Sequence, residues 1–250
     1  MPGKTRYPPE NCLVFVHRGA NTEAMENTRN AFDKALGYAI DGIETDVQLS
    51  RDEIAVLWHD CFLDRIGLSD KHIDDFDYHQ LKALINPESE SEGIMTLQDF
   101  LLTYRDRCRL LLEIKNRDWE PVARHELKIR QTLDLVGQNL DQRIIVSSFN
   151  LPSLVYAYRY NPASPLVYNF ETTQTITDVR ELLNTHAFLH GLCLPIANVD
   201  QAIVDLLREH GKCIAVYTCN TDSEINTALQ LSVDILISDL PHQALMLRDQ

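Results

Sequence analysis

Hydrophobic and polar positions along the chain alternate between two kinds of segment. Short apolar runs rich in Val, Ile and Leu predict strands at 12–17, 42–49, 54–59, 110–115, 143–149, 165–170, 191–195, 213–218 and 234–239. Segments with apolar residues at helical spacing predict helices at 27–38, 96–107, 121–138, 151–160, 176–186, 199–210 and 222–231. Strands that alternate with helices indicate βα units and a parallel sheet.

Several expected helices follow a residue that is favoured at a helix N-cap. The cap candidates are the Asn27-Thr28 pair, Thr96, Asn198 and Thr221. Their side-chain oxygens can accept hydrogen bonds from the free N–H groups of a first helical turn. These residues therefore predict where the helices begin.

Nine expected strands are one more than a closed eight-stranded barrel needs. The runs 42–49 and 54–59 are separated by a few polar residues. They cannot be parallel neighbours, because a parallel crossover needs about a dozen residues. We expect a hairpin centred near Arg51-Asp52, which would place Glu44 opposite His59 across the ladder.

Counting the second hairpin strand as an excursion leaves eight parallel strands, so the predicted fold is a (β/α)8 TIM-type barrel. The chain shows no internal repeat and no convincing linker, so residues 1–250 are expected to form a single domain. A short insertion at about 60–95 is expected to form a cap over the barrel mouth.

The net charge of -14 changes which partners are expected. Nucleic acids and anionic membrane surfaces both need clustered Lys and Arg, so neither is an expected partner. No stretch approaches the ~18 apolar residues of a membrane span, and residues 1–11 lack the apolar segment of a signal peptide. Six scattered cysteines lie mostly within apolar runs, as reduced cysteines do, so we expect a cytoplasmic protein. The sequence indicates no oligomeric state.

Candidate chemistry gathers where the expected barrel strands end. Barrels place their active sites at the C-terminal ends of the strands. The candidate side chains at these ends, and at the end of the excursion strand, are His17, Arg18, Glu44, Asp46, His59, Glu113 and Lys115. Each one alone has a structural explanation, such as a salt bridge or a solvated edge. Together they would lie at one barrel mouth, which favours a functional site.

These residue types suit the cleavage of a phosphate ester. The three carboxylates Glu44, Asp46 and Glu113 form a hard oxygen site that suits Mg²⁺ or Ca²⁺. The two histidines can serve as general acid and general base, and the two cations can hold phosphoryl oxygens. A zinc amidohydrolase would be expected to carry a His-x-His pair on the first strand, where this sequence has only His17. A P-loop enzyme is excluded because the sequence lacks the P-loop motif.

An ordered set of motifs resembles the glycerophosphodiester phosphodiesterase family, whose signature reads HRG, ENT, IExD and HD. The signature matches are His17-Arg18-Gly19, Glu26-Asn27-Thr28, Ile43-Glu44-Thr45-Asp46 and His59-Asp60. Further matches are Thr96-Leu97, Leu112-Glu113-Ile114-Lys115, Ser147-Ser148-Phe149, Val216-Tyr217-Thr218 with Asn220, and Ser238-Asp239. The similarity covers about residues 12–241.

The resemblance implies a metal-dependent barrel hydrolase that converts small glycerophosphodiesters into glycerol 3-phosphate and an alcohol. It implies that Glu44, Asp46 and Glu113 bind a divalent cation, Mg²⁺ or Ca²⁺. It also implies that His17 and His59 are the catalytic pair. Arg18 and Lys115 would contact the phosphate, and Tyr217, at a position where many members carry Trp, would form an aromatic wall of the substrate site.

Two other functions stay open at this point. One is a sister phosphodiesterase on the same barrel, either phospholipase D-like or phosphoinositide-cleaving, although no amphipathic anchor or basic patch for a membrane surface is evident. The other is a catalytically silent barrel that only binds a ligand. The presence of both histidines and all three carboxylates argues against a silent barrel.

Overall fold

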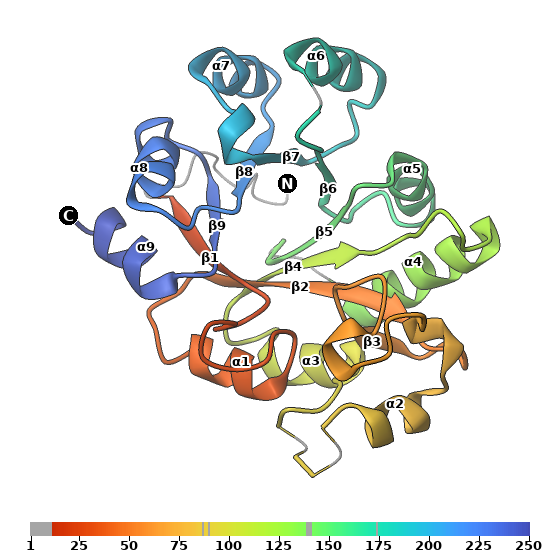
Figure 1. Cartoon of the computed structure of the whole chain (residues 1–250). Coiled ribbons are helices and arrows are strands. Elements are labelled where there is room, and N and C mark those ends of the chain that lie inside the picture. Colours follow the sequence, from red (N-terminus) through yellow and green to blue (C-terminus); the bar gives the residue numbers. More distant parts are fainter. Residues whose placement is uncertain (1–11, 87, 90, 139–141, 174) are drawn as a thin grey trace.

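The computed structural model describes residues 12–86, 88–89, 91–138, 142–173 and 175–250. Eight parallel strands close into a barrel through the pairing of β1 with β2, and helices surround them (Figure 1). The strands are β1 (Leu13–His17), β2 (Gly42–Leu49), β3 (Ala55–Leu57), β4 (Arg109–Ile114), β5 (Ile144–Ser148), β6 (Leu166–Asn169), β7 (Gly191–Pro195), β8 (Cys213–Tyr217) and β9 (Ile235–Ser238). The predicted (β/α)8 barrel is confirmed.

The helices follow the strands in the order expected for βα units. They are α1 (Arg29–Ala35), α2 (Tyr78–Leu84), α3 (Leu97–Tyr104), α4 (Val122–Val136), α5 (Leu151–Tyr160), α6 (Ile176–Thr185), α7 (Gln201–Glu209), α8 (Asp222–Gln230) and α9 (Pro241–Arg248). The final helix α9 was not predicted, although it packs beside α8 and β1 in the closed ring. Within the described ranges, no helix is long and apolar enough to cross a membrane.

The β2–β3 hairpin is antiparallel as predicted, but its predicted register is wrong by one residue. Val47 pairs with Leu57 and Leu49 pairs with Ala55, so the ladder would bring residue 60, rather than His59, opposite Glu44. Moreover, β3 ends at Leu57, before either position is reached. The turn between Ser50 and Ile54 is one residue wider than expected, because Glu53 takes a positive φ of 65° inside it.

Three of the predicted helix caps are confirmed and one is wrong. Thr28, Thr96 and Thr221 each accept a hydrogen bond from a backbone N–H in the first turn of the following helix. Asn198 instead ends a short 3₁₀ turn, and Asp200 caps α7 by accepting from the N–H of Ile203. The 3₁₀ turn Ile196–Asn198 delays the start of α7, so the cap lies two residues after the predicted one.

The insertion after β3 has a small apolar core of its own. Two 3₁₀ turns (Asp64–Ile66 and Ile73–Asp75) and α2 surround the buried Leu63, Ile73 and Leu81. This cluster also includes Trp58, which directly follows β3. The cap is therefore packed onto the hairpin and has a defined position beside the barrel mouth.

Candidate active site

Seven of the eight side chains predicted to form the site line one cavity of about 170 Å³ at the C-terminal ends of the strands. The seven are His17, Arg18, Glu44, His59, Glu113, Lys115 and Tyr217. The eighth, Asp46, is fully buried behind the cavity wall and contacts Arg18 and Lys115. Closure of the barrel thus brings together residues that are 200 positions apart in the chain.

The backbone after β1 turns sharply, and this turn places His17 and Arg18. Arg18 and Gly19 both take positive φ angles, 61° and 83°. A Cβ added at Gly19 would lie 2.7 Å from the carbonyl carbon of Ala31, so only glycine fits against α1 here. The turn returns the chain to Asn27, whose amide donates to Asp46 Oδ2 at 2.9 Å.

The three predicted carboxylates form a compact buried cluster on β2 and β4. One oxygen each from Glu44, Asp46 and Glu113 lies within 4.8 Å of the other two. Glu44 Oε2, Asp46 Oδ1 and Glu113 Oε1 accept no hydrogen bond, although the Lys115 ammonium makes ion pairs with both Asp46 Oδ1 (3.0 Å) and Glu113 Oε1. A buried cluster of carboxylate oxygens, two of which have the Lys115 ammonium as their ion-pair partner, fits a hard divalent cation.

The electrostatics of the carboxylate cluster also favour the binding of a divalent cation. Burial and the neighbouring Asp46 carboxylate raise the pKa of Glu44 well above its ordinary value, and burial also raises the pKa of Glu113. Burial would raise the pKa of Asp46 too, but the Lys115 and Arg18 cations hold it far below the ordinary range. The raised pKa values of Glu44 and Glu113 indicate that two cations do not fully offset three buried carboxylates, and a divalent cation would supply further positive charge.

Both histidines present the same ring nitrogen to the cavity. His17 Nδ1 lies 2.8 Å from Asp239 Oδ1, and His59 Nδ1 lies 2.9 Å from Asp60 Oδ1. Burial would raise the pKa of both aspartates, but their hydrogen bonds, including the one to the adjacent histidine, lower it. The pKa of Asp239 falls to about 2. An ionised carboxylate can only accept, so each Nδ1 carries a proton and each Nε2 faces the site. Burial lowers the pKa of His59 to about 4, which keeps its imidazole neutral and able to accept a proton.

Asp239 is a functional candidate that the sequence reasoning did not select. Asp239 belongs to one of the matching motifs, but its contact with His17 spans 222 positions. Asn21 and Asn220 also donate to its two carboxylate oxygens. Because Asp239 directly follows the last strand of the barrel, only barrel closure could have identified its contact with His17.

A chain of ion pairs links Arg18 to His59 around the mouth. Arg18 pairs with Glu26 at 3.1 Å, Glu26 pairs with Arg65 of the cap at 2.9 Å, and Arg65 pairs with Asp60 at 2.7 Å. Asp60 in turn holds His59. The cap therefore helps to fix the orientation of two site residues.

Tyr217 forms part of the cavity wall on the far side from the cap. Its hydroxyl donates to the carbonyl oxygen of Phe170, and its ring meets Phe149 edge to face at 6.1 Å. The hydroxyl is thus engaged, and the ring provides an apolar surface opposite the carboxylates.

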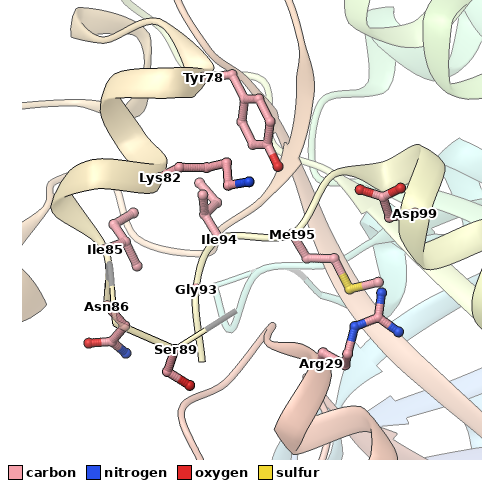
Figure 2. Close-up of a pocket in the computed structure, with 10 residues that line it drawn as sticks. All are labelled: Arg29, Tyr78, Lys82, Ile85, Asn86, Ser89, Gly93, Ile94, Met95 and Asp99. Atoms are coloured by element: carbon pink, nitrogen blue, oxygen red, sulfur yellow. The ribbon is translucent and has the colours of Figure 1, made fainter. Parts of the chain in front are cut away.

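Another cavity, of about 200 Å³, lies between the cap and the outside of the barrel. Figure 2 shows Arg29, Tyr78, Lys82, Met95 and Asp99 around it. It contains none of the predicted site residues, and its lining mixes two cations with a carboxylate. The cavity at the barrel mouth, which contains the predicted site residues, is therefore the candidate active site.

Fold and site together define the chain as a (β/α)8-barrel hydrolase of phosphoric diesters. The sequence profile of the glycerophosphoryl diester phosphodiesterase family matches residues 17–243. The chain belongs to this family.

Known proteins of the family resemble the chain over nearly its whole length. The glycerophosphodiester phosphodiesterase of Bacillus altitudinis is 28% identical over 250 residues, covering 95% of this chain and 98% of that protein. The enzyme of the same name from Caldanaerobacter subterraneus is 27% identical, covering 92% and 94%. An Oleispira antarctica phosphodiesterase, solved in complex with the product sn-glycerol-3-phosphate, is 26% identical with a TM-score of 0.82, covering 96% and 98%.

Proposed function

We propose that the protein hydrolyses small glycerophosphodiesters to glycerol 3-phosphate and an alcohol, with the help of a divalent cation. The observation that carries this proposal is one cavity lined by two histidines, two cations and two buried carboxylates, with the third carboxylate, Asp46, grouped with the other two. The Oleispira relative with bound sn-glycerol-3-phosphate supports the choice of substrate. Membership of the family supports the reaction type.

Glu44, Asp46 and Glu113 would hold Mg²⁺ or Ca²⁺, since carboxylate oxygens are the preferred ligands of both. When bound, the cation would offset negative charge on a phosphoryl oxygen. Arg18 and Lys115 would contact the other phosphoryl oxygens, and Tyr217 would form an apolar wall. Lys115 pairs with Asp46 and Glu113, so it would have to exchange these partners for the phosphate.

His17 and His59 would move the protons. In the first step the neighbouring hydroxyl of the glycerol forms a bond to phosphorus, and the bond from phosphorus to the alcohol oxygen breaks. One histidine takes the hydroxyl proton while the other protonates the leaving alcohol. In the second step water forms a bond to phosphorus, and the bond from phosphorus to the oxygen of the attacking glycerol hydroxyl breaks. The second histidine takes the water proton and the first returns its proton to that glycerol oxygen, so both end as they began.

A direct assay tests this proposal. We expect cation-replete protein to release glycerol 3-phosphate from glycerophosphocholine, and exhaustive EDTA treatment to abolish the release until Mg²⁺ or Ca²⁺ is restored. His17→Ala and His59→Ala should each lower kcat by about 10²–10⁴-fold, with circular dichroism and Tm close to those of the wild type. His79→Ala, at an exposed position of α2, is the matched control. Full turnover in EDTA would refute the metal role, and a loss of only a few-fold would refute the histidine roles.

We also propose that residues 1–250 act as one catalytic domain in the cytoplasm. The continuous ring of βα units supports the single domain. Four of the six cysteines are buried in the apolar interior, as reduced core cysteines are, which supports a reducing compartment. Cell fractionation with an antibody to the native protein tests the location.

A further inference from the structure

Arg65, in the cap, does not line the catalytic cavity, yet it pairs with two carboxylates beside that cavity. Its Nη2 lies 2.9 Å from Glu26 Oε2, and its Nε lies 2.7 Å from Asp60 Oδ2. A planar guanidinium can make two such contacts at a fixed angle, whereas a lysine ammonium is a single point charge. Arg65 therefore joins two carboxylates that come from different loops, one after β1 and one after β3.

Each of these two carboxylates uses one oxygen for Arg65 and the other for a site residue. Glu26 Oε1 accepts a hydrogen bond from Arg18 Nη1 at 3.1 Å, and Asp60 Oδ1 lies 2.9 Å from Nδ1 of His59. Among the residues that the structure describes, Asp60 is the one hydrogen-bond partner of the His59 imidazole. A rotation of the Asp60 carboxylate would therefore remove the bond that orients this ring.

The two carboxylates need a cation between them. One oxygen each of Glu26 and Asp60 and a ring nitrogen of His59 lie within 4.8 Å of one another. Like charges at that distance repel each other, and the side chains of Glu26 and Asp60 are only 12% and 28% exposed, so water screens the repulsion in part. Burial would raise the pKa of Asp60, but hydrogen bonds from His59 and Arg65 lower it, so the carboxylate stays ionised. The Arg65 guanidinium thus supplies the positive charge of this grouping.

The cap holds Arg65 at the edge of the site. Arg65 lies in the 3₁₀ turn Asp64–Ile66, which directly follows Leu63 in the buried apolar core of the cap. A separate contact joins the cap to the loop after β4, where the rings of His72 and Trp119 pack with their centroids 4.5 Å apart. The guanidinium therefore reaches the two carboxylates from a support that is fixed on two sides.

We propose that Arg65 is a positioning residue for the reaction. Through Asp60 it orients the imidazole of His59. Through Glu26 it orients the guanidinium of Arg18. This inference rests on the proposed function, because it concerns the residues that the same reaction uses.

Steady-state kinetics of the cation-replete enzyme with glycerophosphocholine test the proposal. Arg65 is 40% exposed, and ion pairs of such residues add little to stability, so Arg65→Met should have a Tm close to that of the wild type. Its kcat should fall about tenfold and its KM should rise, because His59 moves a proton and Arg18 contacts the phosphate. An unchanged kcat in Arg65→Met would overturn the proposal.

Arg51→Met is the matched control. Arg51 is 53% exposed, and its Nε pairs with Asp77 of the cap at 2.9 Å, so it also joins the cap to the rest of the chain. Neither residue lines the catalytic cavity. Arg51→Met should therefore keep the wild-type kcat and KM, and an equal loss in this variant would show that any weakening of the cap lowers turnover, which contradicts the specific role of Arg65.

A double-mutant cycle tests the route through Asp60. Asp60→Asn should lower kcat by itself, and adding Arg65→Met should lower it little further, because Arg65 acts on His59 only through this carboxylate. Losses that multiply in the double variant would contradict that route.

The orientation of His59 can also be followed without catalysis, by NMR of the histidine ring nitrogens. The His59 signals are identified by their loss in His59→Gln, and the wild type should show a neutral ring protonated at Nδ1. Arg65→Met should shift these signals towards a mixture of the two tautomers, and Arg51→Met should not. Signals unchanged by Arg65→Met would overturn the proposal even in an active enzyme. Signals that depend on Arg65 in a protein inactive towards every glycerophosphodiester would instead contradict the proposed function alone.

Discussion

Glu44→Gln should stabilise the cation-free protein, although it changes a proposed active-site residue. Glu44 lies in the buried cluster with Asp46 and Glu113, and their ligand oxygens are no more than 4.8 Å apart. Each pairwise repulsion at that distance is at least about 3.5 kcal/mol at an effective dielectric constant of about 20. Attraction to Arg18 and Lys115 offsets most of the sum. Glutamine has the same shape without the charge, so we expect a net gain of about 1–2 kcal/mol in unfolding free energy.

The sign of the pH dependence follows from the raised pKa of Glu44. Protonation of Glu44 favours the folded state, so this contribution is fully present below the ordinary glutamate pKa and is lost as the pH rises through the raised folded-state pKa. The advantage of Glu44→Gln should therefore grow with pH. In EDTA at pH 8, the gain corresponds to a Tm rise of roughly 2–8 °C by calorimetry. Glu181→Gln, on the exposed surface of α6, should leave Tm nearly unchanged.

Addition of a cation should reverse the order of stability. At a concentration of about 100 times its Kd, Mg²⁺ or Ca²⁺ should add about 2.7 kcal/mol to the wild type. Glu44→Gln lacks one of the three proposed ligands and should gain far less. A Glu44→Gln protein that is less stable than the wild type in EDTA, or that gains equally from the cation, would refute this account of the cluster.

Two more substitutions test the surroundings of the site. Asp239→Asn should lower kcat on the order of 10²-fold, because it removes the carboxylate that orients His17. Burial would raise the pKa of Asp239, but hydrogen bonds from His17, Asn21 and Asn220 lower it to about 2. The ionised Asp239 therefore stabilises the folded state by about 2 kcal/mol. This contribution is present above the ordinary aspartate pKa and is lost as the pH falls towards 2. The difference in unfolding free energy between this variant and the wild type should shrink over that range. Lys128→Met should cost about 3 kcal/mol in urea unfolding at pH 7, because the buried ammonium that pairs with Glu120 is lost, and adding Glu120→Gln should recover part of it.

The barrel could be predicted from the chain because its evidence is local. Each apolar run of four to eight residues predicts a strand by itself, and the short turn between residues 49 and 54 excludes a parallel pairing without any knowledge of the fold. The charged strand ends could also be recognised locally, since Glu44 and Asp46 share a face by the two-residue period of a strand. Details that depend on one residue more or less in a turn, such as the hairpin register near His59, could not be predicted.

The residues that orient the site residues are placed by long-range contacts, which a local sequence pattern does not reveal. Asp239 reaches His17 because the last barrel strand pairs with the first, and Lys128 of α4 donates to the carbonyl oxygen of Lys115 because that helix packs back over its own strand. A lysine at a helix position is normally expected to face solvent, yet this one is fully buried. Trp119 and His72 come from segments separated by α2, α3 and β4, and they meet only because the cap folds towards the loop after β4. The proposed catalytic and binding residues can therefore be recognised in short sequence motifs. The residues that orient them are brought into place only by the closure of the barrel and the position of its cap.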